Sequence, residues 1–85
     1  MKKNIRIHTH ARDRMQERGV SEEEIIQTIT EGESFDAKFG RIGFRRNFIF
    51  LGIWKGKRYS AKQIELYAVN EENGWLVISV MAKYF

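Results

Sequence analysis

The aromatic residues of this 85-residue chain are confined to its later part: the first of the eleven is Phe35 and the last is Phe85. Aromatic side chains fit the pleated, half-buried surface of a β-sheet, whereas the stretch before Phe35 has the apolar spacing of helices. We therefore predict helices before Phe35 and strands after it. We expect a single domain over residues 1–85, because neither part could bury its apolar face alone.

The first helix is expected to begin at Thr9 or His10 and to run through Arg18. Gly19 follows it, and glycine is the residue that most often ends a helix in the left-handed conformation. Together with the second helix described next, this segment is the best-defined local prediction.

Ser21 and Glu24 predict the start of the second helix, because they form a capping box in which each side chain accepts a hydrogen bond from the other's backbone N–H. This helix is expected to end at Gly32. Its first turn contains Glu22 and Glu23 as well as Glu24. A DNA-binding helix-turn-helix would bring that turn to the bases, where carboxylates repel phosphates, so we reject a helix-turn-helix.

The remaining chain predicts strands separated by turns. A short edge strand is expected over Phe35–Phe39, an inner strand over Phe48–Trp54, which is apolar on both faces, and an alternating strand over Gln63–Val69. A hairpin loop over residues 70–74 leads to Trp75–Tyr84, the most apolar strand, which we place at the centre. The fold class is therefore α+β, with two N-terminal helices packed on a three- to four-stranded antiparallel sheet.

The net charge of +4 is distributed unevenly along the chain. Residues 1–36 and residues 63–85 each sum to −2, whereas residues 37–62, here called the basic segment, hold eight cations and no acid. Cations interleaved with aromatic rings suit a surface that follows phosphates and stacks bases, although they also suit a solvated edge strand. The expected nucleic-acid-binding residues are Arg41, Arg46, Lys55, Lys57, Arg58 and Lys62.

The chain has no cysteine, which excludes a disulfide scaffold and a thiolate-bound metal site. His8, His10 and Asp13 match no established metal site at their spacing, so we expect neither metal nor cofactor. His10 can act as a general acid or base, or can simply open the first helix. The sequence shows no signal region and no apolar run long enough to span a membrane, which leads us to expect a cytoplasmic protein.

Residues 10–21 resemble the opening signature H-A-R-x-R-M-x-x-R-G-[IV]-[ST] of a bacterial family of small domains of unknown function. The segments Gly40-Arg41, residues 54–59, residues 62–65 and Tyr84-Phe85 are similar to one branch of it. That family is similar in fold to RelE-type toxins. The resemblance implies an antiparallel sheet that presents basic residues to RNA, and a toxin that cleaves or binds RNA, with a cognate antitoxin as a protein partner.

The leading hypothesis is a metal-independent endoribonuclease-like domain with catalytic residues His10, Arg45 and Tyr84. An RNA 2′-hydroxyl would attack the adjacent phosphate, while Arg45, Arg46 and Arg58 stabilise the developing charge. His10 or Tyr84 would move the protons. The alternative is a non-catalytic module that binds nucleic acid or an acidic protein, and a gyrase-directed toxin also stays open. The predicted edge strand could pair with another chain to form an oligomer.

Overall fold

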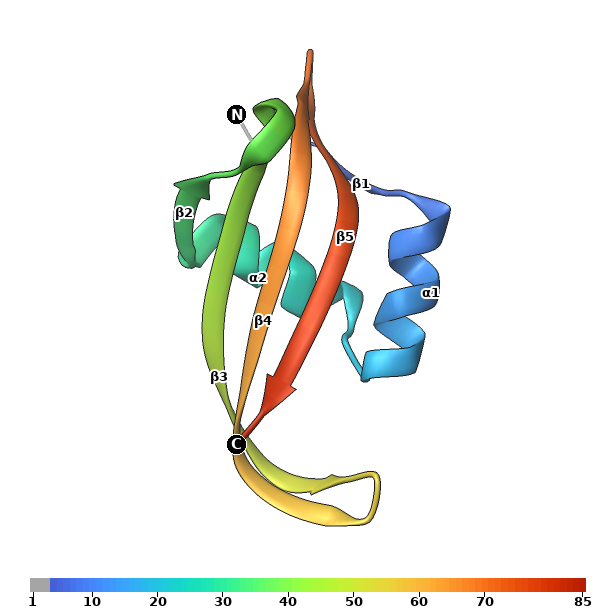
Figure 1. Cartoon of the computed structure of the whole chain (residues 1–85), viewed down its shortest axis with the longest axis vertical. Coiled ribbons are helices and arrows are strands. Elements are labelled where there is room, and N and C mark those ends of the chain that lie inside the picture. The colour runs from blue at the N-terminus through green and yellow to red at the C-terminus, as the bar shows by residue number, and fades with distance from the viewer. Residues whose placement is uncertain (1–3) are drawn as a thin grey trace.

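The computed structural model describes residues 4–85, in which two helices lie on one face of a five-stranded sheet (Figure 1). Residues 1–3 of the predicted domain lie outside this range. The strand order in the sheet is β1-β5-β4-β3-β2. In chain order the elements are β1 (Asn4–Ile7), α1 (Thr9–Arg18), α2 (Glu22–Glu31), β2 (Glu33–Asp36), the 3₁₀ turn η1 (Lys38–Gly40), β3 (Ile42–Trp54), β4 (Lys57–Glu71) and β5 (Gly74–Tyr84).

Both predicted helices are confirmed, together with the residues that begin and end them. His8 caps α1, since its side chain accepts a hydrogen bond from the backbone N–H of His10. Gly19 ends α1 with φ 67, in the left-handed region. The capping box of α2 is complete, with Ser21 Oγ and the Glu24 carboxylate each accepting the other's backbone N–H at 3.1 and 2.9 Å. Neither these nor any other helix within residues 4–85 is long and apolar enough to cross a membrane.

The sheet confirms the α+β class but corrects the predicted architecture. It has five strands instead of three or four, and it is mixed, because β1 pairs with β5 in parallel. β4 is the middle strand, whereas Trp75–Tyr84, now β5, was predicted to be central. The prediction missed β1 because four residues show too short an alternation, and their pairing depends on an edge of β5 that only the folded chain provides.

The predicted edge strand over Phe35–Phe39 is shifted towards the N-terminus. β2 covers Glu33–Asp36, and the chain then turns through η1. Phe39 and Gly40 both have positive φ, 61 and 71, which is incompatible with an extended strand. A tight turn here is what allows β2 to pair with the start of β3.

The segment Phe48–Trp54 is the outer part of β3 and not an inner strand. Within the described residues this part of β3 pairs with β4 alone, and the two strands form a curled hairpin that extends past the helices (Figure 1). We call residues 49–61 the arm. Ile49, Leu51 and Ile53 are exposed on one side of it, at 84%, 75% and 62%. Its other side packs against the domain, where the rings of Phe50 and Trp54 contact Tyr84.

The two faces of the sheet differ in what covers them. Alternate residues of β4 from Lys62 to Ala68 are buried under the helices, where they meet core residues such as Ala11 and Ile25. The side chains between them point to the face without helices, here called the open face. With their partners across the neighbouring strands, the residues of the open face used below are Phe35, Arg45, Gln63, Glu65, Tyr67 and Lys83.

Candidate nucleic-acid interface

Glu65 lies in the middle of the open face between an arginine and a tyrosine. Arg45 Nε is 3.2 Å from Glu65 Oε1, and Tyr67 OH donates a hydrogen bond of 2.6 Å to Glu65 Oε2. The Arg45 guanidinium also lies over the ring of Phe35, 4.8 Å from its centroid. Since Arg45 and Glu65 side chains remain 38% and 26% exposed, a ligand can reach this Arg45–Glu65–Tyr67 cluster.

The cluster combines a carboxylate that can accept a proton (Glu65), a guanidinium cation (Arg45) and a hydroxyl that can donate a proton (Tyr67). The hydrogen bond to Glu65 is the main cause that raises the pKa of Tyr67 above its ordinary value; burial and the Glu65 charge add to it, and Arg45 opposes it. Tyr67 therefore keeps its proton at neutral pH. Arg45 Nε is buried without a hydrogen bond of good geometry among the residues that the structure describes. A hollow of about 270 Å³ lies beside Glu65, with Lys83 in its wall.

The predicted catalytic residues His10, Arg45 and Tyr84 are not brought together. Arg45 is on the open face, whereas Tyr84 is on the helix-covered face, where its hydroxyl donates a 2.6 Å hydrogen bond to the carbonyl of Arg18. His10 is exposed in the first turn of α1, stacked on His8, at the end of the helix away from Arg18. No group of three or more metal-ligating side chains occurs within residues 4–85.

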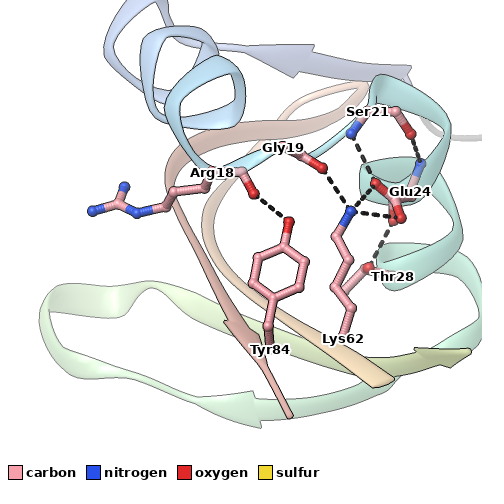
Figure 2. A network of polar contacts seen from close by, with 7 residues as sticks. All are labelled: Arg18, Gly19, Ser21, Glu24, Thr28, Lys62 and Tyr84. Atoms are coloured by element: carbon pink, nitrogen blue, oxygen red, sulfur yellow. Dashed lines mark hydrogen bonds and ion pairs between the residues drawn. The ribbon is translucent and has the colours of Figure 1, made fainter. Parts of the chain in front are cut away.

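Lys62, predicted to bind nucleic acid, is inside the protein and 4% exposed (Figure 2). Its ammonium donates to the Gly19 carbonyl at 2.6 Å and to both Glu24 oxygens at 2.8 and 3.0 Å. All three of its donors are used, so Lys62 offers none to a phosphate. The contact instead attaches the α1–α2 turn to the sheet. Burial, and secondly the Glu24 charge, raise the pKa of the neighbouring Tyr84.

The other cations of the basic segment form two clusters, near the two ends of β3. Arg46 lies between them and is 3.6 Å from Glu31 on the helix-covered side. Arg41 lies near the start of β3, and the arm tip carries the second cluster. Five of these cations have no carboxylate within 4 Å in the described part of the chain: Lys38, Arg41, Lys55, Lys57 and Arg58.

Sequence reasoning missed Glu65 and Tyr67 as site residues. The one available signal was the alternation of β4, which puts residues two apart on the same face. Their connection to Arg45 depends on the β3–β4 register, in which Arg45 lies opposite Glu65. That register arises from a hairpin whose long arm contains a bulge, and no local pattern specified it.

Comparisons with known proteins support the expected kind of family. No curated protein and no solved structure matched the chain. A family described as Domain of unknown function (DUF4258) matches residues 7–82, which include both helices, β2, β3 and β4. The prediction of a small domain of unknown function is thereby confirmed. The chain belongs to the DUF4258 family.

Proposed function

We propose that this protein is an RNA-binding, endoribonuclease-like domain of the RelE toxin type, acting in the bacterial cytoplasm. The observation that carries the proposal is the Arg45–Glu65–Tyr67 cluster, which lies open to solvent between two groups of unpaired cations. Phosphates following β3 would meet a cation at each end and Arg45 in the middle. The resemblance of residues 10–21 to the signature of the toxin-like family supports the same function.

In the proposed reaction, the RNA 2′-oxygen attacks the adjacent phosphorus and the bond to the 5′-oxygen breaks. Glu65 accepts the proton of the 2′-hydroxyl, and Tyr67 donates its proton to the departing 5′-oxygen. The proton then passes from Glu65 to Tyr67 along their 2.6 Å hydrogen bond, which restores both groups. Arg45 stabilises the charge that develops on the phosphoryl oxygens. The products are a 2′,3′-cyclic phosphate and a 5′-hydroxyl.

The test is to incubate the purified protein with single-stranded RNA in EDTA. We expect cleavage to cyclic phosphate ends, and Arg45→Ala should slow it about 10²- to 10³-fold, because a preorganised cation is lost. Arg6→Ala is the matched control, since Arg6 also pairs with a strand carboxylate, Glu71, at 3.5 Å, but outside the cluster. Negligible cleavage by all three proteins would overturn the nuclease proposal.

We also propose a protein partner for the arm, because the exposed apolar side chains on its outer side suit contact with a protein. Ile49, Leu51 and Ile53 are exposed there, and a groove of about 410 Å³ joins Leu51 to Phe85 and Arg58. Among the strands of residues 4–85, none lies beside the outer edge of this part of β3. With three cations at the tip, the best-fitting occupant is an extended acidic segment with alternating apolar residues, as an antitoxin-type partner could supply.

A peptide of alternating valine and glutamate is a direct probe of this surface. We expect it to bind, and Leu51→Ser to weaken binding about 10-fold, since an apolar contact near the centre of the groove is removed. Met81→Ser is the matched control, because Met81 is exposed on β5 away from the arm. Equal binding by polyglutamate, or a dimer at sedimentation equilibrium that Leu51→Ser dissociates, would contradict the acidic-partner proposal.

A further inference from the structure

The η1 turn presents a phenylalanine to solvent in a backbone conformation that phenylalanine rarely adopts. Phe39 has φ 61 and ψ 35 and is 86% exposed. Glycine, asparagine and aspartate are the usual residues at such turn positions, because a larger side chain strains the left-handed backbone. Neither the turn geometry nor the core explains a phenylalanine here. Residues held in a strained backbone conformation cluster at ligand-binding and active sites.

Phe39 borders a hollow of about 390 Å³ at the end of the open face, which we call the turn pocket. Two more aromatic rings line it, Phe35 and Tyr67, which meet edge to face with centroids 6.1 Å apart. Lys38 and Arg41 also line it, and the Arg41 guanidinium is 5.7 Å from the Phe39 centroid. Aromatic rings can stack on bases, and cations without a carboxylate partner can bind phosphates.

Asp36 is the acidic residue in the wall of the turn pocket. The lining holds two cations against this one acidic residue, so the pocket keeps a positive balance towards a phosphate. A carboxylate can also accept hydrogen bonds from the N–H groups on the edge of a base. The lining therefore offers partners to the face and the edge of a base and to a phosphate.

We infer that the turn pocket is a nucleotide subsite, in which a base stacks on Phe39 while Lys38 and Arg41 hold the adjoining phosphate. The inference rests on the RNA binding proposed above and extends it. Tyr67 connects the two sites, because its ring lines the pocket and its hydroxyl is bonded to Glu65. The subsite thus holds a nucleotide beside the phosphate that the Arg45–Glu65–Tyr67 cluster contacts.

The test uses a short single-stranded oligonucleotide with 2′-O-methyl groups, which lacks the attacking hydroxyl and cannot be cleaved, with binding followed by fluorescence anisotropy. We expect Phe39→Asn to weaken binding about 10-fold or more, since one stacked base is lost, and Phe39→Trp to preserve it. Ile26→Ala is the matched control, because Ile26 is also an exposed apolar residue, at 43%, but lies on α2 outside the turn pocket. It should bind as the unmodified protein does.

Thermal unfolding separates a binding role from a structural one. Asparagine suits the left-handed position, so Phe39→Asn should melt no lower than the unmodified protein while binding RNA less tightly. Unchanged oligonucleotide binding by this variant would overturn the subsite. The nuclease proposal is tested independently, by measuring RNA cleavage in EDTA. If Phe39→Asn binds the oligonucleotide normally and the protein still cleaves RNA, only the subsite is overturned.

Discussion

Lys62→Met is expected to lower the free energy of unfolding by about 3 kcal/mol, because it breaks a buried ion pair on one side only. Methionine keeps most of the apolar stem but removes the donor to the Gly19 carbonyl and the partner of Glu24. The Glu24 side chain is 23% exposed, so water can partly solvate its unpaired charge, which places the effect at the lower end of the usual range. For a domain with a total stability of about 5–15 kcal/mol, this is a large loss.

Urea unfolding followed by circular dichroism measures this effect. Lys57→Met is the matched control, since Lys57 is exposed on the arm without a carboxylate partner, and we expect a change within about 0.5 kcal/mol. Equal midpoints and slopes for the two variants would show that the buried ammonium does not attach the helices to the sheet.

Glu65→Gln is expected to lower the rate of RNA cleavage about 10²- to 10⁴-fold, the usual contribution of a general base. Glutamine has the same size and can still accept the hydrogen bond from Tyr67, but it cannot take up the proton of the 2′-hydroxyl. Because the pKa of Tyr67 is raised above its ordinary 10.0, its proton is available throughout the neutral range. Cleavage should therefore not be lost through Tyr67 until the pH rises above about 10.

Initial rates in EDTA, together with binding of the uncleavable oligonucleotide, test this prediction. Binding by Glu65→Gln should be unchanged or tighter, because one negative charge leaves the open face. Glu71→Gln is the matched control, since Glu71 also lies on β4 and pairs with an arginine. Cleavage by Glu65→Gln at the rate of the unmodified protein would show that Glu65 is not the general base. That result would not bear on RNA binding.

The helices were predictable because the groups that begin and end them lie within a few residues of one another. The capping box joins residues three apart, and Gly19 follows α1 directly. The strands β4 and β5 were predictable as elements, whereas β1 was missed and the neighbours of the strands could not be predicted. The parallel pairing of β1 with β5 joins Ile5 to Trp75, and such a contact depends on the arrangement of the whole chain.

The candidate site shows the same division. The positions of the cations along the chain were evident, but whether each one is available depends on distant partners. Lys62 and Lys57 look alike in the basic segment, yet Lys62 meets Glu24 from α2 whereas Lys57 stays exposed. Arg45 and Arg46 are adjacent, and strand alternation sends them to opposite faces, where Glu65 and Glu31 pair with them.

The amino-acid sequence alone therefore determined the two helices, the change to strands near Phe35, and the basic segment, because each depends on local spacing or composition. The tertiary structure alone decided the mixed five-stranded sheet, the buried role of Lys62 and the meeting of Arg45 with Glu65 and Tyr67. These features are contacts between residues far apart in the chain. Their geometry follows from strand register and from which face the helices cover, and no local pattern encodes either.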